Sequence, residues 1–301
     1  MSEASAGSAE AWILATRPRT LPVSIGPVLV GTAVAFVEDG MHIAAALAAC
    51  AGALLLQVGS NLANDVYDFE KGADTEERRG PPRAAQLGLL SPAALKRGMG
   101  VAFVLATLVG AYLTWLAGPL VVAIGIASIV AAIAYTGGPW PLGYHGLGEV
   151  AVFVFFGLAA VVGTTFVQTG GFPTLAWIAS VPVGSLATAI LVVNNLRDID
   201  TDRIAGKRTL AVRWGLGAAR SEWAVMVFGA YAMILVPWFL YGRSFWILLP
   251  WLCLPRAITL WRVVRSNDSG PALNEVLANT AQLGVLFSLL FAVGLALGLG
   301  A

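Results

Sequence analysis

The sequence NNLRDIDTDR, residues 194–203, ends a long apolar run with a dense group of charged and amide side chains. Asn194, Asp198 and Asp202 are spaced four residues apart, so on a helix their side chains share one face. Carboxylate and amide oxygens suit Mg²⁺, which usually shares its coordination with substrate phosphates. Lys207 and Arg208 follow closely and suit the same phosphates. This stretch therefore predicts a magnesium and phosphate site at the end of an apolar helix.

A similar stretch, NLANDVYDFEKGAD at residues 61–74, ends an earlier apolar run. Asn64 and Asp68 repeat the four-residue interval, 130 positions before their counterparts. Gly72 stands where a third acid would be expected, and Asp74 follows two residues later. We predict a duplicated unit with one site shared between its halves. We also expect Asp74 to reach the metal, because Gly72 lets the chain turn.

The composition is that of a protein that crosses the membrane many times. Of the 301 residues, 58% are hydrophobic and 12% are charged, and the mean hydropathy is +0.79. A soluble domain has about 25% charged residues. The net charge of +1 gives no sign of a nucleic-acid partner, and membrane lipid is the expected surrounding. Residues 1–10 are mostly small and polar, so we predict a disordered tail there, followed by a single transmembrane domain over residues 11–301.

Apolar runs of the length that spans a bilayer, roughly 20 residues, recur along the chain. They predict an all-α fold, a polytopic membrane protein with about nine transmembrane helices. The expected spans are residues 21–37, 42–62, 98–116, 119–136, 148–168, 173–195, 222–241, 244–262 and 274–298.

The Lys and Arg residues predict how these spans are oriented. Sixteen of the 18 lie before the first span or in the segments after the second, sixth and eighth spans. Because cytoplasmic loops carry an excess of basic residues, we expect these segments in the cytoplasm. The N-terminus is then cytoplasmic, and the C-terminus lies outside the inner (cytoplasmic) membrane. Both acid-rich stretches would end helices that run in the same direction.

Several linked motifs make the chain resemble the UbiA superfamily of intramembrane prenyltransferases, and within it the branch that acts on 1,4-dihydroxy-2-naphthoate in menaquinone synthesis. The superfamily pattern Asn-xxx-Asp-xxx-Asp corresponds to Asn64 and Asp68, with Asp74 as the displaced third acid. Its second pattern, Asp-xxx-Asp, corresponds to Asp198 and Asp202. The resemblance covers residues 11–300. The matching stretches are RPRTLP at 17–22, residues 61–74, YTGGP at 135–139, GLGE at 146–149 and the run at 194–213.

This resemblance implies a fold and a chemistry. The helices would form a UbiA-type bundle around a central cavity that opens to the cytoplasmic side and laterally to lipid. Two Mg²⁺ ions would neutralise the diphosphate of a polyprenyl diphosphate, whose allylic C–O bond ionises. The ring of 1,4-dihydroxy-2-naphthoate would attack the allyl cation, and loss of CO₂ would give demethylmenaquinol.

The resemblance and the charge pattern together assign roles to individual residues. The catalytic candidates are Asp68, Asp198, Asp202 and Tyr135. The metal candidates are Asn64, Asp68, Asp74, Asn194, Asp198 and Asp202. The diphosphate-binding candidates are Arg17, Lys71, Lys207 and Arg208. The acceptor-binding candidates are Asn61, Arg83, His145 and Glu149. Ordinary alternatives stay open, since Tyr135 could be an interfacial anchor and Asp65 could replace Asp74 as the third ligand.

Two other functions also stay open. One is a UbiA-type transferase with another aromatic acceptor, such as 4-hydroxybenzoate, homogentisate or a porphyrinoid. The other is an ion-coupled transporter, since acids within the membrane are typical of transporters. Transporters, however, often have inverted repeats with sites near the midplane, whereas the acids here belong to a parallel repeat. Diphosphate release that depends on Mg²⁺ would separate an enzyme from a transporter.

Overall fold

The computed structural model describes residues 5–74 and 78–300, and over these ranges the secondary structure is entirely helical. A π-helical stretch, Phe153–Ala159, joins α6 to α7, and a 3₁₀ stretch, Phe245–Cys253, leads into α12. The α-helices are α1 (Ala9–Thr16), α2 (Ile25–Val37), α3 (Ile43–Glu70), α4 (Pro92–Ala117), α5 (Leu120–Ala134), α6 (Gly148–Val152), α7 (Ala160–Thr169), α8 (Thr174–Arg197), α9 (Ile199–Ile204), α10 (Leu210–Met233), α11 (Leu235–Leu240), α12 (Leu254–Ser266) and α13 (Gly270–Leu299).

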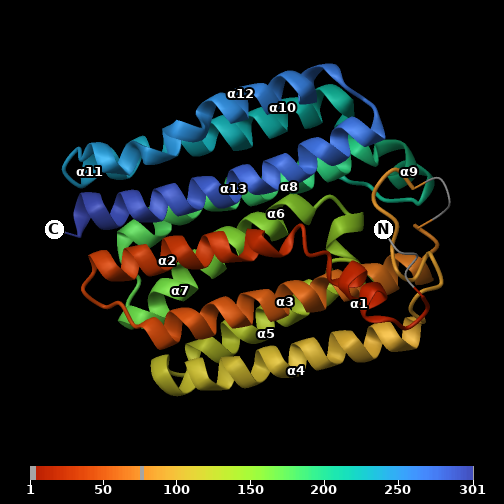
Figure 1. Cartoon of the computed structure of the whole chain (residues 1–301), viewed down its shortest axis with the longest axis horizontal. Coiled ribbons are helices and arrows are strands. Elements are labelled where there is room, and N and C mark those ends of the chain that lie inside the picture. The colour runs from red at the N-terminus through yellow and green to blue at the C-terminus, as the bar shows by residue number, and fades with distance from the viewer. Residues whose placement is uncertain (1–4, 75–77, 301) are drawn as a thin grey trace.

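The long helices lie side by side along the longest axis of the molecule (Figure 1). α3 packs on α4 and α5, α2 packs on α7 and α13, and α8 packs on α10 and α13. α1 and α9 lie at the end of the bundle where the N-terminus is found, and the C-terminus lies at the opposite end (Figure 1). α3 and α8 both finish at the α9 end, so the two acid-rich stretches meet there.

The number of spans is lower than predicted when it is judged by length and composition. Among the described residues, seven helices are long and apolar enough to cross a membrane, or eight if the bent pair Ala9–Thr16 and Leu21–Val37 forms one span. The helix that falls short is α5. Its 15 residues reach only about 22 Å, less than the ~30 Å hydrocarbon core. The multi-pass prediction is confirmed, but the count of nine is not.

α3 and α8 end differently, and this difference separates their third acids. After α3, Gly72 adopts a φ of +69°, which glycine allows at low cost, and the chain leaves the helix before Asp74. After α8, Asp198 leads directly into α9, and the Asp202 N–H donates to the Asp198 carbonyl at 2.7 Å. Asp202 therefore lies one helical turn after Asp198, on the same face. Asp74 lies beyond the end of α3 and does not continue the helix face of Asp68.

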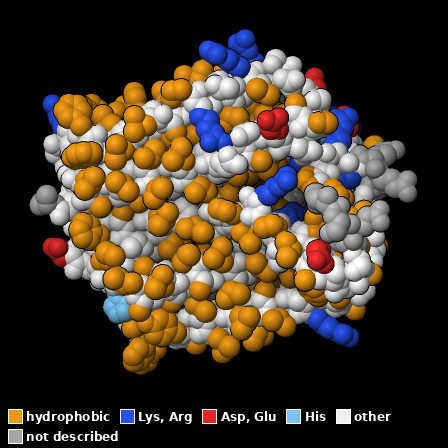
Figure 2. All heavy atoms as spheres, in the orientation of Figure 1, with side chains coloured by type: hydrophobic (Ala, Val, Ile, Leu, Met, Phe, Trp, Pro, Cys, Tyr) orange, Lys and Arg blue, Asp and Glu red, His pale blue; other side chains and the backbone are white. Residues whose placement is uncertain are grey.

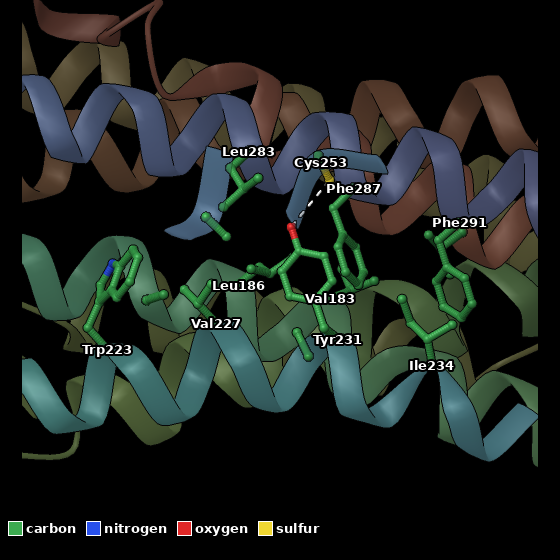
Figure 3. Close-up of a cluster of buried hydrophobic side chains, with 14 of the residues drawn as sticks. Val183, Leu186, Trp223, Val227, Tyr231, Ile234, Cys253, Leu283, Phe287 and Phe291 are labelled. Carbon is green, nitrogen blue, oxygen red and sulfur yellow. Dashed lines mark hydrogen bonds between the residues drawn. The ribbon is translucent and has the colours of Figure 1, made fainter. Parts of the chain in front are cut away.

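A buried cluster between α8, α10 and α13 holds the C-terminal half together (Figure 3). Along α10 and its C-cap, Trp223, Val227, Tyr231 and Ile234 recur every three or four residues, the spacing of one helix face. Their partners are Val183 and Leu186 of α8 and Leu283, Phe287 and Phe291 of α13. Because lipid is as apolar as these side chains, close packing rather than escape from water stabilises the cluster.

The surface and the N-terminal segment complete the fold. On the face in Figure 2, hydrophobic side chains cover the middle of the molecule, and most charged side chains lie toward the α9 end. The predicted tail over residues 1–10 is wrong in its last part, because Ser8 caps α1 and the Gly7 N–H donates to the Leu89 carbonyl at 2.9 Å. Residues 1–4 lie outside the described residues.

Candidate active site

The acid-rich stretches of both halves form one cavity at the α9 end of the bundle. Lys207, in the loop after α9, places its ammonium 3.2 Å from Asp68 Oδ1 and 3.7 Å from Asp202 Oδ1. Asp68, Asp198 and Asp202 are all buried in the protein, yet all three line a cavity of about 250 Å³. The other predicted residues that line it are Arg17, Asn61, Asn64, Arg83, Tyr135, Asn194 and Lys207.

In the first half, Asp68 is held by groups from outside its own helix. The Tyr144 hydroxyl donates to Asp68 Oδ1 at 2.7 Å, and Arg83 Nη2 lies 2.8 Å from Asp68 Oδ2. Arg83 also pairs through Nη1 with Asp74 at 2.9 Å, and Arg78 pairs with the other Asp74 oxygen. Asp74 does not line the cavity. It lies behind Arg83, outside the lining where the sequence prediction placed it as a metal ligand.

The alternative third ligand, Asp65, is also occupied elsewhere. Its two carboxylate oxygens accept hydrogen bonds from the N–H groups of Ala84 and Ala85, at 3.2 and 3.3 Å. Asp65 is buried and does not line the cavity. Asp65 therefore fixes the position of the loop that carries Arg83.

In the second half, one buried arginine organises the motif from within. Arg197 donates through Nε to Asp198 at 2.8 Å and through Nη2 to Asn194 Oδ1 at 2.8 Å. Its Nη1 donates to Asn274 Oδ1 of α13 at 2.8 Å. Asp202 has no arginine partner among the described residues, and its nearest cation is Lys207.

The metal chemistry can be tested on these side chains. Burial raises the pKa of Asp202 to about 6; Lys207 opposes the rise, and the nearby carboxylates of Asp198 and Asp68 add to it. A divalent cation would relieve this repulsion, and the predicted metal ligands Asn64 and Asn194 line the same cavity. As they stand, no three His, Cys, Asp or Glu side chains of the described chain are grouped tightly enough to hold a metal. Lys207 instead bridges the carboxylates of Asp68 and Asp202, whose oxygens are of the kind that Mg²⁺ prefers.

The cavity also has a basic lining suited to an anion. The basic lining residues are Arg17, Arg78, Arg83 and Lys207. Arg17 Nη2 is buried with no hydrogen-bond partner in the described part of the chain, so it is available to a phosphate oxygen. Two predicted phosphate ligands lie elsewhere. Lys71 donates to the Thr136 carbonyl at 2.6 Å, and Arg208 is exposed; neither lines the cavity.

The acceptor candidates divide in the same way. Asn61 lines the cavity and donates to the Thr16 carbonyl at 2.9 Å, and Arg83 lines it between Asp68 and Asp74. His145 instead stacks on Trp140 with ring centroids 4.5 Å apart, outside the lining. Glu149 is buried one layer behind the lining, where it accepts a hydrogen bond from Asn195.

A second, apolar cavity of about 510 Å³ continues from the first. The residues that line both cavities, here called the junction, are Gln57, Ser60, Tyr135, Val152 and Phe156. The apolar cavity reaches the surface beside α5, where Val122 and Ile126 line it and are 46% and 59% exposed. The combined space has a polar end for a charged group and an apolar end for a long hydrocarbon.

Comparison with known proteins identifies the family. Residues 24–281 match the UbiA prenyltransferase family. The chain belongs to this family. The 1,4-dihydroxy-2-naphthoate octaprenyltransferase of Escherichia coli (strain K12) is 36% identical over 303 residues, which cover 98% of this chain and 98% of the relative. The protein of the same name from Mycobacterium tuberculosis is 38% identical over 290 residues, 95% of this chain and 97% of the relative.

Solved structures share the fold of this prenyltransferase. The structure of a UbiA homolog from Archaeoglobus fulgidus bound to GPP and Mg2+ matches with a TM-score of 0.71, over 95% of this chain and 99% of that one. The two sequences are 13% identical, so the match concerns the fold alone. The prediction of a UbiA-type helical bundle is confirmed.

Sequence reasoning missed three side chains in the cavity of this prenyltransferase. Tyr144 donates to Asp68, but in the sequence it looks like any aromatic residue near a membrane surface. Arg78 resembles an orientation signal, yet it lines the cavity and pairs with Asp74. Asn195 lines the cavity as well, and its place in the Asn194-Asn195 pair is the signal that could have identified it.

Proposed function

We propose that this prenyltransferase transfers a polyprenyl group from a polyprenyl diphosphate to 1,4-dihydroxy-2-naphthoate, with loss of CO₂ and diphosphate, giving demethylmenaquinol. The observation that supports the donor is the continuity of a basic, acid-lined cavity with an apolar one. Support for the acceptor comes from the two relatives of that name, which are 36% and 38% identical over at least 95% of the chain.

In this proposal two Mg²⁺ ions are held by the carboxylates of Asp68, Asp198 and Asp202 and by two asparagine amides, those of Asn64 and Asn194. Bound Mg²⁺ supplies stabilisation of the negative charge that develops on the departing diphosphate. We assign Asp74 another role, because it is paired with Arg78 and Arg83 and lies outside the lining. It positions Arg83, which in turn orients Asp68.

The basic lining and the apolar cavity then divide the donor between them. Arg17 and Lys207 bind phosphate oxygens, because both are cationic and line the cavity, and Arg17 Nη2 is buried with no hydrogen-bond partner among the described residues. The prenyl tail lies in the apolar cavity, which keeps water away from the allylic carbon. That carbon is then at the junction, beside Tyr135, where the two cavities meet.

The bond changes follow from the two substrates. The allylic C–O bond breaks, and its electron pair leaves with the diphosphate. The ring carbon that bears the carboxylate forms the new C–C bond to the allylic carbon. The bond to the carboxylate then breaks, and its electron pair returns to the ring as CO₂ leaves. The residues at the junction have to hold the ring carbon in contact with the allylic carbon for this exchange.

We further propose that the α9 end faces the cytoplasm, since sixteen of the 18 Lys and Arg residues belong to segments predicted on that side. A C-terminal alkaline phosphatase fusion tests the orientation. Alkaline phosphatase is active only outside the inner membrane, so phosphatase activity is expected from the fusion. An inactive fusion that is fully expressed and inserted would reverse the orientation.

The activity is tested with purified protein in detergent, polyprenyl diphosphates of several lengths and a panel of aromatic acceptors. Mass spectrometry should detect a decarboxylated prenyl naphthalene product only when 1,4-dihydroxy-2-naphthoate and Mg²⁺ are both present. Product from 4-hydroxybenzoate instead would assign another acceptor. Failure to release diphosphate with any acceptor, together with ion flux in vesicles, would favour a transporter.

A further inference from the structure

Asn195 lies next to a metal candidate but faces another part of the cavity. Successive residues on a helix are turned by about 100°, so the Asn195 side chain points away from the Asn194 and Asp198 face of α8. Asn195 is 6% exposed and lines the polar cavity, as does Leu191 one turn earlier. A Cβ on Gly148 would lie 3.3 Å from Leu191 and 3.0 Å from the Tyr135 hydroxyl. Asn195 therefore faces the side of the cavity where Tyr135 marks the junction.

Glu149 fixes the orientation of the Asn195 amide. Glu149 Oε1 accepts a hydrogen bond from Asn195 Nδ2 at 2.7 Å, and Glu149 is 5% exposed. This bond uses the donor side of the amide, which leaves Asn195 Oδ1 as an acceptor. Within the described ranges Asn195 Oδ1 has no hydrogen-bond partner. It is also not one of the fully buried polar atoms that lack a partner. The amide therefore presents an acceptor to the cavity.

The same pair carries a cost that packing alone does not explain. Glu149 Oε2 is buried with no hydrogen-bond partner among the described residues. A buried oxygen without a partner destabilises a fold. Such conflicts with stability are expected at functional sites. The Glu149 carboxylate is therefore buried at a cost, and its side-chain hydrogen bond is the one that orients Asn195.

We propose that Asn195 Oδ1 accepts a hydrogen bond from the 4-hydroxyl of the naphthalene acceptor, and that Glu149 is the positioning residue that holds Asn195 ready for it. This proposal rests on the proposed function and names the contact that orients its acceptor. Because Asn195 Oδ1 accepts hydrogen bonds, it suits a hydroxyl group and would repel the carboxylate of the naphthalene substrate. The 1-hydroxyl already donates to the adjacent carboxylate within the molecule, which leaves the 4-hydroxyl free to bind Asn195.

The test compares two acceptor-like molecules that differ at one group. The acceptor is 1,4-dihydroxy-2-naphthoate, and the probe is 1-hydroxy-2-naphthoate, which lacks the 4-hydroxyl and is used as a competitor. In wild-type protein the probe should bind more weakly than the acceptor by roughly 2- to 12-fold, the factor for one neutral hydrogen bond. Asn195→Ala should raise the KM for the acceptor by the same factor and leave the Ki of the probe unchanged.

The positioning role has its own readout. Glu149→Leu releases the amide, so it should raise the KM for the acceptor much as Asn195→Ala does, with the KM for the prenyl diphosphate unchanged. Glu149→Gln keeps an oxygen for Asn195 Nδ2 and should restore most of the lost acceptor affinity. Ser185→Ala, which removes a buried hydroxyl from the same helix, is the control for general loosening of α8.

Several results would overturn the proposal while leaving the proposed function intact. They are equal binding of acceptor and probe to wild-type protein, a matching rise of the probe's Ki in Asn195→Ala, or equal effects on the KM of donor and acceptor in Glu149→Leu. The wild-type comparison needs no variant, so it stands even if a variant fails to fold. Wild-type protein that makes no product from 1,4-dihydroxy-2-naphthoate would instead overturn the proposed function.

Discussion

The acid-rich ends of α3 and α8 share a sequence pattern, yet they hold their acids in different ways. At α3, Asp68 depends on Arg83 and Tyr144, which come from later segments of the chain. At α8, Asp198 is held by Arg197 from the same helix, and α13 anchors that arginine through Asn274. The acid at the end of α3 is thus held by residues from other segments, whereas the acid at the end of α8 is held largely by its own helix.

A single backbone turn explains the different fates of the third acids. Gly72 ends the helical register at the first site, and Asp74 turns away from the cavity to pair with Arg78 and Arg83. At the second site α9 continues the register, and Asp202 lines the cavity. Acids at nearly matching positions therefore have different surroundings, one paired with two arginines and the other lining the cavity.

The largest expected effect distinguishes these roles through stability. Asp74→Ala removes the carboxylate that pairs with Arg78 and one of the two that pair with Arg83, and these arginine side chains are 14% and 9% exposed. Loss of one partner of a buried ion pair costs about 3–5 kcal/mol. We expect Asp74→Ala to lower the unfolding free energy in detergent by that amount, with Asp202→Ala as the matched comparison that loses little. A stable Asp74→Ala protein that no longer responds to Mg²⁺ would restore Asp74 as a ligand.

The second effect distinguishes two acids within α9. Asp202→Ala should lower kcat by about 10²- to 10³-fold, the loss seen when one electrostatic contact to a transition state is removed. Asp200 is the control, because its side chain is 51% exposed and pairs with Arg79 at 2.8 Å. Diphosphate release at saturating Mg²⁺ gives the measurement. Similar rates in the two variants would remove Asp202 from the site.

The third effect separates two neighbouring basic residues. Lys207 lines the cavity and Arg208 is exposed, so the sequence prediction that both bind phosphate is narrowed to Lys207. A hydrogen bond to a charged group is worth about 1.5–3 kcal/mol, so Lys207→Ala should lower kcat/KM for the prenyl donor by roughly 10- to 150-fold. Arg208→Ala should leave it near the wild-type value. Steady-state kinetics with each substrate varied would reject this if the two variants were alike.

The smallest effect concerns the ion pair at the surface between Arg79, in the segment after α3, and Asp200 of α9. Arg79 and Asp200 lie 2.8 Å apart, and their side chains are 39% and 51% exposed. Exposed pairs contribute about 0.2–1 kcal/mol. Arg79→Ala should therefore change stability by no more than this and leave kcat/KM close to that of wild type. A large kinetic loss would show that the pair closes the cavity.

Much of the fold was predictable, because the apolar core of a bilayer requires runs of roughly 20 apolar residues, and such runs recur along the sequence. α5 was not, since a short apolar helix and a full span look alike in a run of residues that includes its flanks. At the site, Asp68, Asp198 and Asp202 were found through helical periodicity and line the cavity. The pairing of Asp74 could not be predicted from sequence, because it depends on how the following loop folds back to place Arg78 and Arg83 beside Asp74.

Side-chain contacts that no sequence pattern reveals place two other candidates outside the cavity lining. His145 stacks on Trp140 outside the lining, and Glu149 lies one layer behind the lining. Tyr144 reaches Asp68 across 76 positions of sequence, a separation that no local pattern encodes. These placements are set by packing, and packing is specified by many residues together.

The opening beside α5, where Val122 and Ile126 line the apolar cavity at the surface, changes how substrate supply has to be measured. A donor whose tail enters there arrives by diffusion within the bilayer, and its supply is set by its mole fraction among the lipids. In vesicles, adding lipid at a fixed mole fraction of donor should leave the rate per enzyme unchanged. Diluting the donor with plain lipid should lower the rate, even though the amount of donor in the tube stays the same.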